Sequence, residues 1–239
     1  MRRIALLLVA GTTIVAPAAA DARAKVDVMV VGESAVLAGP ERVALKARTA
    51  PVGGKRCSIG RATPLSVLAG TGAPFSLKDY GACSRRARDA GSLYVRKIGP
   101  DRERGTDGWV YKVGRRAGSA GAADPAGSFG TGRLLRAGQR VLWFWCVKDP
   151  ADTCQRTLEV TPASRRVEPG ATLSATVRGY DEAGEGVPVA GAMVRLGDAV
   201  ASTDEDGVAT LSAPAAGRYR LRAEKPGLVV SFPARVTVG

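Results

Sequence analysis

Two stretches decide the fold of this chain: Gly108-Trp-Val-Tyr-Lys-Val-Gly114 and Arg140-Val-Leu-Trp-Phe-Trp-Cys-Val147. The second is apolar at every position after its first residue, so both faces of the strand it predicts are apolar. Such a strand is central in its sheet or is covered on both sides. Side chains alternate along a strand, so Trp143 and Trp145 share one face, as do Trp109 and Tyr111. The four rings can therefore line one sheet surface.

The residues before these stretches predict the rest of a small domain. Valines at every second position predict a strand over 26–30, and an apolar run predicts another over 92–98. Residues 63–70 predict a short helix, because Thr63 can cap it and Pro64 suits the first helical position. One helix among several strands indicates an α+β domain.

The chain changes character near residue 158. Residues 21–158 contain 24 basic and 12 acidic residues, a net charge of +12, whereas residues 159–239 contain 9 basic and 10 acidic residues, a net charge of −1. The second segment reads as short strands separated by turns rich in Gly and Asp, which is typical of an antiparallel β-sandwich. We therefore expect a mainly β protein with an α+β domain over 21–158 and a β-sandwich over 159–239.

Residues 1–20 have the three parts of a secretory signal peptide: a basic start, an apolar run and small residues at Ala18 and Ala20. The apolar run is about 12 residues, shorter than the ~20 needed to cross a bilayer. We expect cleavage, with an uncleaved anchor as the alternative. No later segment is suited to cross a membrane, so the sequence predicts a secreted or cell-envelope-associated protein without a transmembrane segment.

Four cysteines lie in the first domain: Cys57, Cys83, Cys146 and Cys154. An even number in an exported chain favours disulfides, and three pairings are possible. We favour Cys146 with Cys154, because a turn-like stretch separates them, which leaves Cys57 with Cys83. Zinc is the alternative, but the spacings contain no C-x-x-C and the chain has no histidine. We expect no metal site and no cofactor.

No catalytic residue can be assigned from the sequence. Histidine, the commonest general base, is absent. The serines and carboxylates form no local pattern of nucleophile or acid–base pair. The turn Asp204-Glu-Asp-Gly207 invites comparison with a calcium loop, but it lacks the alternating ligands and distal Glu of an EF-hand and predicts a hairpin turn. We expect a non-catalytic protein, and an enzyme that uses carboxylates is the alternative.

The two stretches quoted first resemble the transcobalamin-like C-terminal domain family. Its pattern is a G-W-x-Y-x-V strand, matched by 108–113, and a G-x-x-V-x-W strand, matched by 138–143. The resemblance covers 26–146 and implies a β-grasp-like fold with its helix at 63–70. Some relatives contact cobalamin. The family's usual Asn-Gly after the first strand is Gly114-Arg115 here, so a ligand contact made by that Asn is not carried over.

Most of the second domain, over 167–238, is similar to carboxypeptidase-regulatory-like and other bacterial Ig-like domains. The matching patterns are V-x-G-x-x-V-x-L over 189–196, T-D-x-x-G-x-A over 203–209 and G-x-Y-x-L over 217–221. The similarity implies an Ig-like sandwich. Such domains commonly serve as spacers or adhesion modules, so it says little about function.

Two groups of residues are candidates for binding. The rings of Trp109, Tyr111, Trp143 and Trp145 either stack on a planar ligand such as a sugar or a corrin, or form the domain core. The basic clusters either bind an anionic cell-wall polymer or are solvated surface; they are Arg85-Arg86-x-Arg88, Arg96-Lys97, Arg102-x-Arg104, Arg115-Arg116 and Arg133-x-x-Arg136. Export argues against nucleic acid as the partner.

The sequence therefore predicts a secreted, non-catalytic binding or envelope-associated protein that contacts an anionic wall polymer through its basic N-terminal domain. The alternative is a binding protein for a small molecule of the cobalamin type. The ligand-binding residues would be Trp109, Tyr111, Trp143, Trp145, Arg115 and Arg116.

Overall fold

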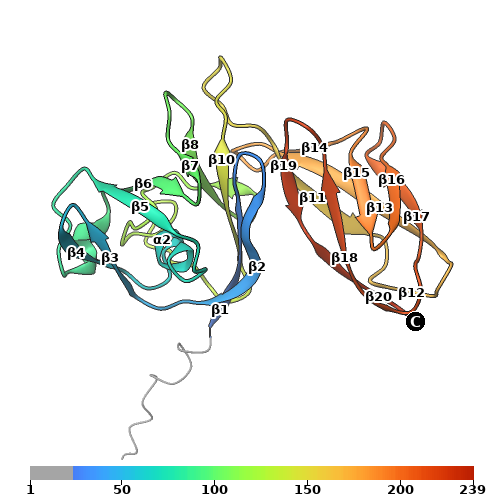
Figure 1. Ribbon diagram of the computed structural model, residues 1–239, viewed down its shortest axis with the longest axis horizontal. Helices are drawn as coiled ribbons and strands as arrows, with labels where there is room; N and C mark the ends of the chain where they lie inside the picture. The colour runs from blue at the N-terminus through green and yellow to red at the C-terminus, as the bar shows by residue number, and fades with distance from the viewer. Residues whose placement is uncertain (1–23) are drawn as a thin grey trace, which may run out of the picture.

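The computed structural model describes residues 24–239, and the expected signal peptide lies outside the described residues. Two lobes lie side by side along the long axis of the molecule (Figure 1). The protein is mainly β, with a small α+β lobe followed by a β-sandwich, which confirms the predicted fold class. None of the helices in residues 24–239 is long and apolar enough to cross a membrane.

A five-stranded mixed sheet forms the centre of the N-terminal lobe, in the order β2-β1-β10-β8-β9. Its strands are β1 (Lys25–Val31), β2 (Val36–Ala44), β8 (Gly108–Val113), β9 (Arg116–Ala117) and β10 (Arg140–Cys146). The central strands β1 and β10 are parallel, and the flanking pairs are antiparallel. A parallel central pair between antiparallel neighbours fits the β-grasp-like fold that the resemblance implies.

The short helix α2 (Pro64–Leu68) contributes to the core on one face of this sheet. The Thr63 side chain accepts a hydrogen bond from the Ser66 amide, and the Ser66 side chain accepts one from the Thr63 amide. This reciprocal capping box satisfies two amides that the first turn leaves unpaired. All residues of the helix are buried. The helix therefore starts at the cap that the sequence predicts.

Two smaller sheets complete the N-terminal lobe. Their strands, with one 3-10 helix, are β3 (Arg48–Val52), β4 (Lys55–Ile59), β5 (Phe75–Asp79), η1 (Ala87–Ala90), β6 (Leu93–Ile98) and β7 (Asp101–Arg102). β3 pairs with β4, and β5, β6 and β7 form the other sheet. They enclose the same apolar core as α2.

Both disulfides have the pairing that the spacing favoured. Cys57 on β4 is joined to Cys83 in the loop after β5, and Cys146 at the end of β10 is joined to Cys154. The two bridges close loops of different length, with sequence separations of 26 and 8 residues. All four sulfurs belong to buried residues.

Replacing Cys57 and Cys83 together by Ala is expected to lower the free energy of unfolding by about 3.5 kcal/mol, and replacing Cys146 and Cys154 by about 2.5 kcal/mol. The longer loop gives the larger loss, because its bridge removes more entropy from the unfolded chain. Urea unfolding of the two variants measures both values. The intact mass of the unreduced protein is the control, and detection of free thiols would contradict the pairing.

The C-terminal lobe is a sandwich of two sheets. One has the order β14-β13-β11-β19, with β17 paired to β13, and the other has the order β12-β20-β18-β15-β16. Their strands are β11 (Thr157–Pro162), β12 (Arg166–Val167), β13 (Thr172–Tyr180), β14 (Gly186–Pro188), β15 (Met193–Leu196), β16 (Ala199–Ser202), β17 (Val208–Ser212), β18 (Gly217–Glu224), β19 (Val229–Phe232) and β20 (Ala234–Val238).

The sandwich differs from the expectation in two details. It is not wholly antiparallel, because β11 pairs with β19 and β12 pairs with β20 in parallel. The expected boundary after residue 158 falls inside β11, whose first residue already belongs to the C-terminal sheet. The composition changes near residue 158, but strand pairing sets the structural boundary.

An apolar cluster joins the two lobes. Met29 and Val31 of β1 and Leu142 and Phe144 of β10 pack with Val229 and, at its margin, Phe232. These residues lie on the opposite face of the central sheet from Trp143 and Trp145, which belong to the N-terminal core. β10 is therefore covered on both faces, as its unbroken apolar sequence predicts.

Candidate functional site

The four aromatic rings singled out in the sequence lie together in the core of the N-terminal lobe. Tyr111 is directly opposite Trp143 and Trp109 is directly opposite Trp145 across the β8–β10 pair, with ring centroids 5.3 and 5.7 Å apart. None is more than 6% exposed. Tyr111 also donates a hydrogen bond to the Ala120 carbonyl at 2.7 Å. The shared face was predicted, but its burial leaves a planar ligand no access to these rings.

Arg115 is a residue of the lobe junction. Its guanidinium donates two hydrogen bonds to the carboxylate of Glu159, at 2.9 and 2.8 Å, and lies 4.4 Å from the centre of the Tyr180 ring. Because this ion pair neutralises the guanidinium, Arg115 adds no net positive charge to the junction. Arg116 lies over the ring of Phe129 at 5.3 Å, and it lines both a cavity beside that ring and the junction cavity that Arg115 also lines.

Three other basic clusters of the N-terminal lobe are neutralised in part, because one arginine of each is in an ion pair. Arg96 forms an ion pair with Glu103, Arg104 pairs with Glu33, and Arg88 pairs with Asp89. Exposed pairs of this kind add little stability, but each cancels a positive charge that could attract an anion. The number of arginines in these sequence clusters therefore overstates their net positive charge.

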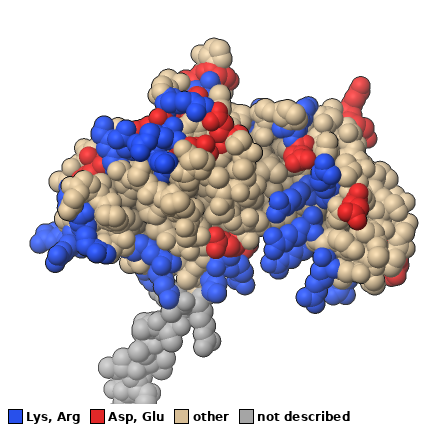
Figure 2. All heavy atoms as spheres, viewed as in Figure 1, with Lys and Arg blue, Asp and Glu red and all other residues tan. Residues whose placement is uncertain are grey.

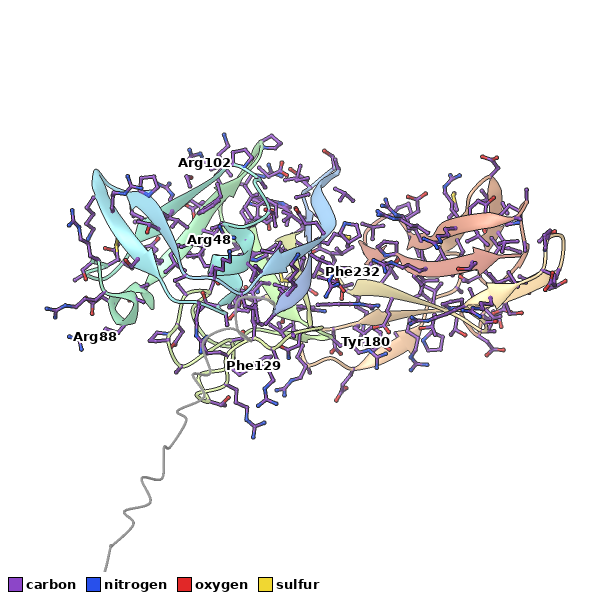
Figure 3. All side chains as sticks on the ribbon, turned by 90° about the horizontal axis from the view of Figure 1, so that it is seen from below. Arg48, Arg88, Arg102, Phe129, Tyr180 and Phe232 are labelled. Carbon is purple, nitrogen blue, oxygen red and sulfur yellow. A yellow bond between two sulfur atoms is a disulfide. The ribbon has the colours of Figure 1, made fainter. Side chains whose placement is uncertain are left out.

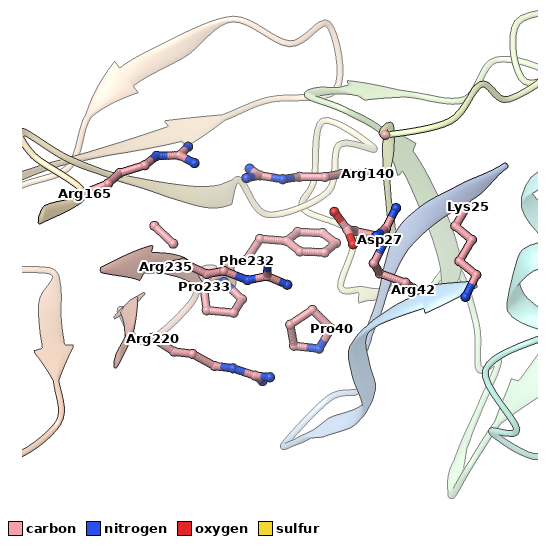
Figure 4. A pocket seen from close by; sticks show the side chains of 12 residues that line it. Lys25, Asp27, Pro40, Arg42, Arg140, Arg165, Arg220, Phe232, Pro233 and Arg235 are labelled. Carbon is pink, nitrogen blue, oxygen red and sulfur yellow. The ribbon is translucent and has the colours of Figure 1, made fainter. Parts of the chain in front are cut away.

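A cavity at the junction of the two lobes is lined by basic residues that lie far apart in the sequence. Its volume is about 280 Å³, and its basic lining residues are Lys25, Arg42, Arg140, Arg165, Arg220 and Arg235. Asp27 is the one acidic residue in this lining. Figure 4 shows Arg140 and Arg165 reaching toward each other from opposite lobes, with Phe232 beside Arg140. We call this cavity the basic groove.

The N-terminal wall of the basic groove is the polar end of a sheet face. On β1, Asp27 lies on the face opposite to the buried Val26 and Val28. Strand register places Arg42 of β2 on one side of Asp27 and Arg140 of β10 on the other. Further along the same face the side chains become apolar and pack on the C-terminal lobe. The junction thus brings this charged end against a second lobe.

The C-terminal wall carries two arginines directly opposite each other. Arg220 of β18 is paired in register with Arg235 of β20, and both side chains are exposed. Like charges in this position destabilise a sheet. Arg165 lies beside them, since its carbonyl accepts a hydrogen bond from the Thr237 amide at 2.9 Å. Within residues 24–239, none of these three arginines is in an ion pair.

Aromatic side chains border the groove at the junction. Phe232 lines it, and the guanidinium of Arg140 lies 5.6 Å from the centre of that ring. A second cavity shares Arg140 and Phe232 with the groove and continues to Tyr180. Figure 3 shows Tyr180 and Phe232 where the two lobes meet. Arg140 is half-buried beside this ring, which strengthens its attraction for an anion, whereas the other five cations of the groove are exposed.

The acidic turn Asp204–Gly207 is an ordinary hairpin turn. The Asp204 side chain accepts hydrogen bonds from the amides of Asp206 and Val208, at 3.0 and 2.8 Å. These bonds use the carboxylate to close the turn. In the described part of the chain, no group of three His, Cys, Asp or Glu residues is placed to hold a metal ion.

The comparisons with known proteins assign no function to this site. No protein-family model and no curated protein matches the chain. Among solved structures, the chain is similar to one described as "D00-D0 domain of Intimin", with 12% identity and a TM-score of 0.26, over 81% of this chain and 93% of that one. A likeness at this level carries no argument about function. The resemblances noted in the sequence stay predictions, and the basic groove has to be interpreted from its own chemistry.

Proposed function

We propose that this protein is a secreted, non-catalytic binding protein that holds an anionic polymer of the cell envelope in the basic groove. The observation that carries the proposal is the convergence of six cationic side chains around one acidic side chain at the lobe junction. The sequence pointed to an anionic polymer but placed it on the N-terminal domain alone. Three of the six cations of the groove belong to the C-terminal lobe.

The chemistry of the groove favours binding over catalysis. Its cations are mostly arginines, whose planar guanidinium forks match the oxygens of phosphate and carboxylate groups. Asp27 is the one carboxylate in the lining, and no serine, threonine or cysteine lies beside it to act as a nucleophile. A site of this kind can hold and orient anionic groups without cleaving them.

The two disulfides support an oxidising location outside the cytoplasm. An exported protein meets anionic polymers of the cell envelope in that location. A positive groove also attracts such polymers over a distance of about one Debye length, ~8 Å at physiological salt. Attraction by charge would hold the protein at the envelope.

Binding of the purified protein to immobilised anionic polymers tests this function. Long-chain polyphosphate supplies phosphate groups, polygalacturonate supplies carboxylates, and neutral dextran is the control. We expect affinity for at least one anionic polymer to fall linearly with salt concentration on logarithmic axes, as ion release predicts. Absence of binding to both polymers at low salt, or equal binding to dextran, would refute the proposed function.

A further inference from the structure

Most basic residues of the C-terminal lobe lie on one face of the sandwich. Residues 159–239 contain nine basic and ten acidic residues, so the segment is close to neutral overall. Most of its basic residues nevertheless lie on the strands, or at the edge, of one sheet, β12-β20-β18-β15-β16. We call this surface the arginine face; it comprises Arg165, Arg166, Arg195, Arg218, Arg220, Arg222 and Arg235.

The alternation of side chains along β18 creates the arginine face. Tyr219, Leu221 and Ala223 point into the sandwich and pack on its core. Arg218, Arg220 and Arg222 alternate with them and therefore point outward. The neighbouring β20 follows the same rule, with Val236 and Val238 inside and Arg235 outside. Figure 2 shows Lys and Arg side chains gathered over this part of the C-terminal lobe.

Strand register places like charges opposite each other at two positions. Arg220 faces Arg235 across β18 and β20, and Arg222 faces Arg195 across β18 and β15. Each such pair costs about 0.2–1 kcal/mol of folding stability. Glu224 is the one acidic residue in the five strands, and it pairs with Arg195 at 3.3 Å. The positive charge of this face is therefore largely uncompensated by the protein.

The arginine face is continuous with the basic groove, because Arg165, Arg220 and Arg235 belong to both. Residues two apart on a strand are about 6.7 Å apart, and adjacent strands are about 4.8 Å apart. A chain leaving the groove across this sheet would thus meet another guanidinium every few ångströms. A single small anion would occupy only the groove and leave the rest of the face unused.

We infer that the ligand is a linear polyanion, which enters the basic groove with one segment and continues across the arginine face. This inference rests on the proposed function and names its ligand class as an extended chain of anionic groups. A flat anionic lipid surface fits less well. Arg140 lies half-buried in the concave junction, so a flat surface lying on the arginine face would not reach it.

Three double variants and three probes test the inference. The face variant is Arg218→Gln with Arg222→Gln, and the groove variant is Arg42→Gln with Arg140→Gln. The matched control, Arg56→Gln with Arg178→Gln, removes two exposed charges outside both surfaces. The probes are tripolyphosphate, long-chain polyphosphate and vesicles of phosphatidylglycerol. Affinity for each is measured over a range of salt concentrations.

We expect the face variant to bind tripolyphosphate as the wild type does, and to bind long-chain polyphosphate about tenfold or more weakly. The slope of its affinity against salt should fall by about two, one for each lost contact. The groove variant should bind both phosphates more weakly, and the control should bind both unchanged.

Three outcomes would overturn the inference or its basis. Unchanged polyphosphate binding by the face variant, with loss in the groove variant, overturns the extended ligand but leaves the proposed function intact. Vesicle binding that depends on the face and not on the groove identifies a lipid surface instead. Failure of the wild type to bind either phosphate, together with no binding to polygalacturonate, removes the proposed function itself.

Discussion

Arg220→Glu is expected to weaken binding of long-chain polyphosphate about 100-fold and, at the same time, to make the protein slightly more stable. The variant removes one charge-assisted contact, worth about 1.5–3 kcal/mol. It also places a carboxylate opposite Arg235, which then pairs with it instead of with the ligand. Both effects lower the affinity. A tenfold change in the dissociation constant corresponds to about 1.4 kcal/mol, so the expected 100-fold loss corresponds to about 2.8 kcal/mol.

The gain in stability follows from the same register. In the wild type, two exposed guanidinium groups lie directly opposite each other on β18 and β20. Replacing this repulsion by a cross-strand ion pair should raise the free energy of unfolding by about 0.5–1 kcal/mol. A loss of binding in a more stable protein cannot be ascribed to damage of the fold.

Urea unfolding and polyphosphate binding of the same protein sample measure both effects. Arg56→Glu is the control, because it reverses an exposed charge on β4, outside both the basic groove and the arginine face. Its affinity should fall less than about threefold, as expected for a change in net charge alone. Equal affinities of Arg220→Glu and the wild type would contradict the basic groove as the binding site.

The parts of the fold that the sequence predicts are those decided by short patterns. β8 and β10 follow from their apolar residues, and α2 follows from the Thr63 cap and Pro64. β2 was not predicted, because most of its residues are only half-buried and its apolar positions do not alternate regularly. Strands at the margin of a sheet depend on pairing partners far along the chain, and no local window contains them.

The candidate site could not be predicted for a related reason. Arg42, Arg140 and Arg220 are far apart in sequence, and only the packing of two lobes brings them to one cavity. The net charge of each segment does not indicate the site, because the C-terminal segment is nearly neutral overall. One usable signal was present: arginines at every second position from 218 to 222, with apolar residues between them, predict one basic strand face.

For the aromatic residues, the sequence predicts the shared face but not its burial. The period of the sequence placed four rings on one sheet face, and the register of β8 with β10 agrees. Whether that face meets solvent depends on what covers it, and here α2 and the smaller sheets contribute to the same core. Periodicity predicts which residues share a face, but the burial of that face is a property of the whole fold.

Lys112→Met is expected to lower the free energy of unfolding by about 3 kcal/mol at pH 7, and the loss should grow as the pH rises toward 10. Lys112 is 1% exposed and belongs to β8. Its ammonium group donates hydrogen bonds to the Thr157 hydroxyl at 2.9 Å and to the carbonyls of Tyr180 and Asp181, both at 2.8 Å. All three acceptors lie at the edge of the C-terminal sandwich, and Met satisfies none of them.

The pH dependence has a defined sign. Burial lowers the pKa of Lys112 from 10.5 to about 8, although the negative charges of Asp181 and Glu182 oppose the shift. Between these two values the unfolded chain binds a proton that the folded protein does not, so this residue makes the wild type more stable as the pH rises. Burial raises the pKa of Tyr111 from 10 to about 12, so ionisation of Tyr111 in the unfolded chain destabilises the fold above pH 10.

Urea unfolding of both proteins from pH 7 to 10 separates the contribution of Lys112 from that of Tyr111, which the two proteins share. Lys46→Met, at an exposed position, is the control and should follow the wild type. Parallel stability curves for Lys112→Met and the wild type would contradict the lowered pKa.

The two walls of the basic groove belong to the two lobes that Lys112 joins. Lys112→Met should therefore weaken polyphosphate binding even under conditions in which the protein is folded. Arg220→Glu should weaken the same binding without any loss of stability.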